Sequence, residues 1–110
     1  MSCEIRHEGD VAVVALTGDI DLESSPKVRT ALLDCVGLKQ GVLIDLSAVS
    51  YIDSSGVASL VEAFQTARKS DTRFGLVSVS QPAMRVLELA RLDRIFSIYE
   101  SVAEGIRDPS

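Results

Sequence analysis

The residues of this sequence best suited to chemistry lie in one short stretch, Asp53-Ser54-Ser55-Gly56. An apolar run ends here, a carboxylate and two hydroxyls follow, and an amphipathic helix begins, with apolar residues recurring at helical spacing from Val57 to Ala67. The side-chain oxygens can accept hydrogen bonds from the first free amides of that helix, whose positive end favours negative charge. The fold is therefore expected to tolerate a phosphate group on a serine at this position.

Spacing alone leaves more than one interpretation of these four residues. Ser54 is either an exposed hydroxyl that a kinase modifies, which would add about −1.5 to −2 charges, or part of a simple helix cap made by Asp53, Ser54 or Ser55. Ser55 is the main competitor for the modified position, and local chemistry does not separate the two serines. Gly56 either lets a partner approach the backbone closely or is a small residue in a crowded first turn.

The sequence around this stretch resembles the STAS domain of bacterial anti-sigma factor antagonists. Val42-Leu43-Ile44-Asp45-Leu46-Ser47 precedes the motif, and the runs at residues 17–21 and 92–96 also match the family pattern, so that the resemblance covers nearly the whole chain. Many family members have a glycine where this chain has Arg91. A left-handed conformation at Arg91 would cost about 1 kcal/mol, which the fold can bear.

The resemblance implies a phosphorylation-controlled binding module and no enzyme. In its unphosphorylated form it would sequester an anti-sigma factor, which is itself a serine protein kinase of histidine-kinase-like ATPase type. This binding would release a sigma factor by partner switching. The same kinase would phosphorylate Ser54, directly after the aspartate, and a serine phosphatase would reverse this. The implied partner-binding residues are Asp21, Asp53, Ser54, Ser55 and Gly56. Asp19 is at least as well explained as a solvated or helix-capping loop residue.

Two other roles are compatible with the same family. A STAS subunit of an ABC-type lipid transporter would bind the transporter ATPase through the same corner without phosphate turnover. Members of that type often lack the full Asp-Ser-Ser-Gly signature, which disfavours this alternative. A scaffold in a stress-signalling complex is the third possibility, and the sequence does not identify the sigma factor, the upstream signal or the phosphatase.

Composition excludes several other classes of function. With 110 residues, 46% of them hydrophobic, the chain fits one compact globular domain. The resemblance implies that this is a single STAS domain over residues 1–110. Its apolar runs are far shorter than the roughly 20 residues of a membrane span, and the sequence does not open with the basic and then apolar pattern of a leader peptide. These two features predict a soluble, cytoplasmic protein. The net charge of −5 argues against nucleic acid as a partner. Cys3 and Cys35 are expected to be free, buried thiols.

Motifs for autonomous catalysis are missing from the sequence. The stretch around Ser54 lacks the G-x-S-x-G pattern of hydrolases. The one histidine, His7, is predicted to be a surface residue of the first strand, with nothing nearby to complete a catalytic triad. There is no G-x-x-x-x-G-K-[ST] sequence for nucleotide phosphates and no carboxylate and imidazole cluster with metal-ligand spacing. We therefore expect no cofactor and no metal.

A hairpin followed by alternating helices and strands predicts an α/β fold, a single open mixed sheet of four to five strands with about four helices. Strands are expected at residues 3–7, 11–16, 42–46, 74–79 and 95–99. Residues 17–21 are expected to leave the sheet as a loop. A first helix is expected from a cap at Ser25 to Gly37, and a second over residues 57–69. A third is expected to follow Ser80 and run through residue 90, and a fourth to cover residues 101–106. Residues 108–110 are expected to be frayed.

Overall fold

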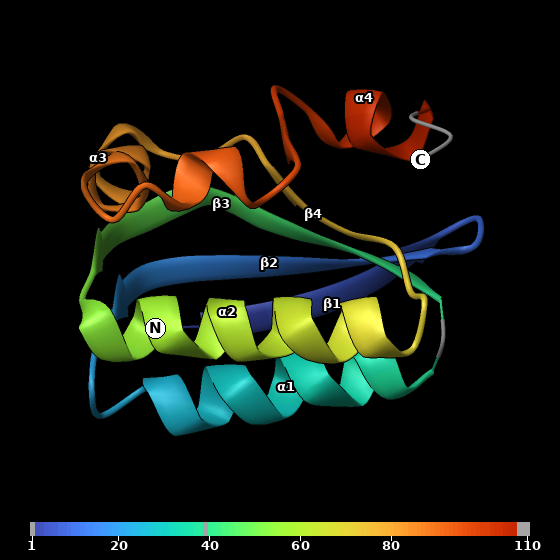
Figure 1. The fold of residues 1–110 in the computed structure, drawn as a ribbon, viewed down its shortest axis with the longest axis horizontal. Helices are drawn as coiled ribbons and strands as arrows, with labels where there is room; N and C mark the ends of the chain where they lie inside the picture. Colours follow the sequence, from blue (N-terminus) through green and yellow to red (C-terminus); the bar gives the residue numbers. More distant parts are fainter. Residues whose placement is uncertain (1, 39, 108–110) are drawn as a thin grey trace.

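The computed structural model describes residues 2–38 and 40–107, which contain one five-stranded sheet (Figure 1). The strands lie in the spatial order β1 (Ser2–Glu8), β2 (Val11–Ile20), β3 (Gly41–Ile52), β4 (Phe74–Val77) and β5 (Ile98–Tyr99). β1 pairs with β2 in antiparallel register, and the other neighbouring strands are parallel. The expected mixed sheet with about four helices is therefore confirmed.

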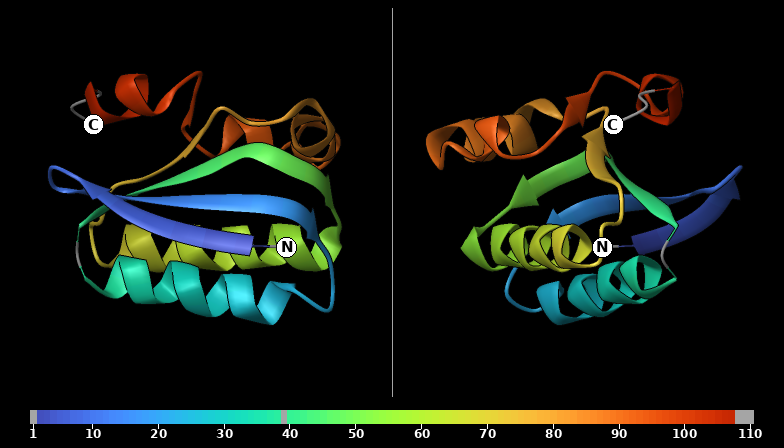
Figure 2. Two further views of the ribbon diagram at one scale, coloured as in Figure 1. Left: turned by 180° about the vertical axis from the view of Figure 1, so that it is seen from behind. Right: turned by 45° about the vertical axis from the view of Figure 1, so that its right-hand side comes forward.

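The helices form a layer on each face of this sheet. α1 (Ser25–Gly37) and α2 (Ser54–Lys69) lie side by side on one face. α3 (Gln81–Leu89), the 3₁₀ turn η1 (Leu92–Arg94) and α4 (Val102–Arg107) lie on the other, as Figures 1 and 2 show. Parallel strands covered in this way are buried on both faces, which explains their nearly continuous apolar sequences.

The core is divided by the sheet, and alternate residues of β2 contribute to its two sides. Ala12, Val14 and Leu16 belong to the large cluster, whereas Val11 and Val13 belong to a small cluster beneath α4. Residues of β2 are thus buried on both faces of the sheet.

The loop predicted at residues 17–21 is wrong for residues 17–20, and only Asp21 lies outside the strand. Thr17 to Ile20 continue β2 and pair with β3, which itself runs on to Ile52. The register shifts between Ala15 and Thr17 and again between Gly18 and Asp19, and Gly18 has φ +81°. A glycine adopts this backbone geometry at little cost, so the bulged strand stays in the sheet. As a result, the ends of β2 and β3 reach the start of α2 together.

Other predicted boundaries also move, and α2 begins at Ser54 rather than at residue 57. β4 ends at Val77 because Ser78 adopts φ +51°, outside strand geometry. β5 begins only at Ile98, since the amides of Ile95 and Phe96 donate to the Leu92 carbonyl in the turn after η1. Ser24, not Ser25, occupies the N-cap position of α1. Arg91 has φ +59°, the left-handed conformation anticipated for it, and residues 108–110 lie outside the described part of the chain.

Candidate functional site

The candidate site is the corner where β2 and β3 end and α2 begins. Ile20 and Ile52 are paired in the parallel register and both are buried. The amide of Asp53 donates to the carbonyl of Ile20 at 3.1 Å, so the first residue after β3 is tied to the neighbouring strand. The start of α2 is therefore held by the sheet on two sides.

Asp53 is the N-cap of α2 and its carboxylate is fully engaged. Oδ1 accepts hydrogen bonds from the amides of Ser55 at 3.0 Å and Gly56 at 3.1 Å and from the Ser55 hydroxyl at 2.5 Å. Oδ2 accepts the amide of Leu22 at 3.1 Å. The Ser55 hydroxyl, followed by the backbone donors, holds the pKa of Asp53 below its ordinary value. The cap therefore stays ionised at neutral pH.

The two adjacent serines have different environments. The Ser54 side chain is exposed and makes no hydrogen bond to any described residue, whereas Ser55 is half-buried and donates its hydroxyl to Asp53. A phosphate donor can reach the Ser54 hydroxyl without breaking an existing contact. Phosphorylation of Ser55 would remove a hydrogen bond of the cap. The geometry thus separates two positions that were equivalent in the sequence.

Gly56 is buried in the first turn of α2. A Cβ atom at this position would lie 2.8 Å from Ile20 Cγ2, 2.8 Å from Ile52 Cγ1 and 2.9 Å from the Ile20 carbonyl oxygen. These distances are well inside van der Waals contact, and they support the crowded first turn rather than a surface left open for a partner. The part of Gly56 in partner binding stays a prediction.

The segment between β2 and α1 is the second part of the site. Asp21 Oδ1 accepts the amides of Glu23 at 3.1 Å and Ser24 at 3.0 Å, and the Asp21 amide donates to Ser24 Oγ at 3.0 Å. The bond from the Leu22 amide to Asp53 links this turn to α2. The structure therefore places Asp21 on the segment next to Asp53 and Ser54, at the same edge of the sheet.

Sequence reasoning missed Leu22, whose side chain is 75% exposed at this corner. It also missed a hollow of about 570 Å³ beside the turn. The residues that line the hollow are Gly18, Asp19, Asp21, Glu23, Ser24 and Lys27. The only sequence signal for Leu22 is an apolar residue between two acidic ones, outside any helical or strand pattern.

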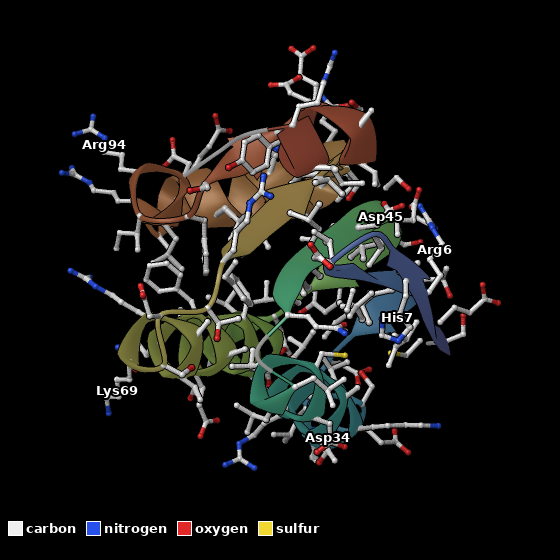
Figure 3. The ribbon with its side chains drawn as sticks, turned by 90° about the vertical axis from the view of Figure 1, so that its right-hand side faces the viewer. Arg6, His7, Asp34, Asp45, Lys69 and Arg94 are labelled. Carbon is white, nitrogen blue, oxygen red and sulfur yellow. The ribbon has the colours of Figure 1, made fainter. Side chains whose placement is uncertain are left out.

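Residues with other possible chemistry lie elsewhere. His7 is exposed on the edge strand β1, with Nδ1 3.2 Å from Gln40 Oε1, and Figure 3 shows it apart from Asp34. Cys3 is a half-buried free thiol and Cys35 a buried one, and burial raises the pKa of both.

Among residues 2–38 and 40–107, no group of three His, Cys, Asp or Glu side chains is placed to hold a metal ion. In the same residues, each helix is too short or too polar for a membrane span.

A family model described as the STAS domain matches residues 2–105. The chain belongs to the STAS domain family. This STAS protein is 34% identical over 101 residues to the anti-sigma-B factor antagonist of Listeria monocytogenes, with 89% of this chain and 88% of the relative covered. It is 30% identical over 101 residues to the anti-sigma-F factor antagonist RsfB of Mycobacterium tuberculosis, with coverage of 91% and 81%.

Solved structures support the same grouping. The crystal structure of an anti-sigma factor antagonist from Mycobacterium paratuberculosis superimposes with a TM-score of 0.87. That protein is 29% identical, and the match covers 96% of this chain and 90% of the other. The family resemblance inferred from the Asp-Ser-Ser-Gly corner is thus confirmed over almost the full length of the STAS protein.

Proposed function

We propose that this STAS protein is an anti-sigma factor antagonist whose binding is switched by phosphorylation of Ser54. The observation that carries the proposal is the exposed Ser54 hydroxyl, which has no hydrogen-bond partner among residues 2–38 and 40–107 and lies directly after a capping aspartate. The Ser55 hydroxyl is engaged by Asp53, whose carboxylate also accepts the amides of Ser55 and Gly56. Relatives at 30% identity or more that span most of this chain are named anti-sigma factor antagonists.

The unphosphorylated protein binds an anti-sigma factor through the corner formed by Asp21, Asp53, Ser54, Ser55 and, indirectly through packing, Gly56. The partner is a serine kinase with a histidine-kinase-like ATPase fold, and its capture releases a sigma factor. The partner also transfers phosphate from ATP to the Ser54 hydroxyl, and a serine phosphatase restores the free form. The protein itself is a regulatory binding module in this scheme.

The capping geometry explains how one phosphate can end the interaction. The Asp53 carboxylate already occupies the amides of Ser55 and Gly56, so a phosphate on Ser54 remains in solvent beside a second negative group. The modification adds about −1.5 to −2 charges on a surface that a partner must bury. An unpaired charge of this kind costs about 3 kcal/mol, roughly a hundredfold or more in affinity.

The test is phosphate transfer from each purified ATPase-type anti-sigma factor of the native cell, with Mg-ATP, followed by peptide mapping by mass spectrometry. Wild type and Ser55→Ala are expected to gain one phosphate on Ser54, and Ser54→Ala none. Circular dichroism of the three proteins checks that they are equally folded. A wild-type protein that receives no phosphate from any of these kinases contradicts the proposal, and so does undiminished transfer to Ser54→Ala.

A further inference from the structure

An exposed leucine stands beside the proposed phosphorylation site. The Leu22 side chain is 75% exposed, and it lies between the acidic residues Asp21 and Glu23 in the turn before α1. Isolated apolar residues are common on protein surfaces, so exposure alone says little about function. The backbone around Leu22 and its link to Asp53 set this leucine apart.

Hydrogen bonds hold the backbone of Leu22 from both sides. Its amide donates to Asp53 Oδ2 at 3.1 Å, and its carbonyl accepts the Ser25 hydroxyl at 3.4 Å. The preceding Asp21 carboxylate accepts two amides of the same turn. The turn is therefore ordered before any partner arrives, and burying the leucine side chain in a complex would cost little further conformational entropy.

The surface around Leu22 defines the chemistry of a partner. Asp19, Asp21 and Glu23 line the adjoining hollow, and Lys27 is the one basic side chain among its lining residues. An apolar side chain surrounded by carboxylates is complementary to an apolar pocket rimmed by lysine or arginine side chains.

We infer that Leu22 is an anchor residue of the surface that binds the anti-sigma factor, and that it enters an apolar pocket with a basic rim on that partner. This inference rests on the proposed function. The anchor would add a specificity determinant that does not involve the phosphate. The Asp53 carboxylate positions both parts of this surface, because it accepts the amide of Leu22 and caps the start of α2, where Ser54 lies.

The test compares Leu22→Ala with Leu38→Ala in binding to the anti-sigma factor that phosphorylates the wild-type protein, measured by isothermal titration calorimetry with Mg-ADP. Leu38 is a matched control because it is 59% exposed and follows the other end of α1. The 13 residues of α1 separate the two leucines by roughly 20 Å. Both substitutions are expected to leave the urea midpoint unchanged.

Leu22→Ala is expected to weaken binding about tenfold to a hundredfold, the loss for an apolar side chain of this size that becomes buried. Leu38→Ala is expected to bind like wild type. Wild-type affinity of Leu22→Ala would overturn the anchor and leave the proposed function standing, and equal weakening by both substitutions would also overturn it. A wild-type protein that binds none of the anti-sigma factors would instead remove the proposed function, and the anchor with it.

Discussion

The starts of α2 and α3 use the same local chemistry and differ in what they leave exposed. Each helix follows a parallel strand of the same sheet and begins at a capping side chain, Asp53 for α2 and Ser80 for α3. The Ser80 hydroxyl accepts the Ala83 amide at 3.4 Å and donates to the Val49 carbonyl at 2.7 Å, so it is occupied by the fold. At α2 an aspartate is the capping residue, and the serine after it makes no hydrogen bond within the described part of the chain.

The comparison shows why a serine at a helix start is not by itself a site. A capping hydroxyl is satisfied by the helix, and modifying it would cost the fold its cap. Where a carboxylate supplies the cap, the next hydroxyl is available for chemistry with no structural role to lose. The start of α2 is a candidate site because a capping aspartate, Asp53, is followed directly by a serine, Ser54, and neither residue alone would suffice.

The largest expected effect concerns the packing beneath the α2 start. Gly56→Ala would place a Cβ atom 2.8 Å from Ile20 and Ile52 side-chain carbons, and it is expected to lower the free energy of unfolding by about 1–3 kcal/mol. Gly37→Ala is the matched control, because a Cβ there would meet nothing within 4 Å. Urea denaturation of both variants measures the difference. Equal stability of the two would contradict the tight contact at Gly56.

The next effect separates the two serines directly. Ser80→Ala removes the cap of α3 and is expected to lower the free energy of unfolding by about 1 kcal/mol. Ser54→Ala removes a hydroxyl that has no partner among the described residues, and its thermal and urea midpoints are expected to match wild type. If Ser54→Ala were as destabilised as Ser80→Ala, Ser54 would be a structural residue and the contrast between the helix starts would be lost.

The smallest effect is a pH dependence at the α2 cap. The pKa of Asp53 is lower in the folded than in the unfolded protein, because the Ser55 hydroxyl and backbone amides bind the charged form. Its contribution to stability is therefore complete above the unfolded value of about 3.9 and is lost as the pH falls through the folded value. The stability advantage of wild type over Asp53→Asn, measured by urea denaturation, is expected to shrink in that acid range. A constant advantage would contradict the charged cap.

Sequence pattern predicted the parts of the fold that depend on local periodicity. The apolar run at residues 42–46 and the helical stripe from Val57 identified the strand and the helix that flank the site. The polar residues Thr17, Gly18 and Asp19 carry no strand pattern, and they remain in the sheet because β3 supplies partners through a bulged register. Such pairing depends on tertiary contacts that no local window of sequence contains.

The candidate site was likewise predictable in part. The spacing of Asp53, Ser54 and Ser55 indicated a helix start with available hydroxyls, but which hydroxyl points to the cap depends on the geometry of the first turn. Leu22 gave only a weak signal, an apolar residue between two acidic ones, because the hydrogen bond that links it to the site is made to a residue 31 positions away.

The measurement that tests this account most directly is the affinity of one purified anti-sigma factor for the protein before and after stoichiometric phosphorylation of Ser54. The account predicts tight binding of the free form and a loss of about a hundredfold or more on phosphorylation. Circular dichroism and urea midpoints of the two forms are expected to agree. Equal affinity of the two forms would contradict the claim that the Ser54 hydroxyl is the switch.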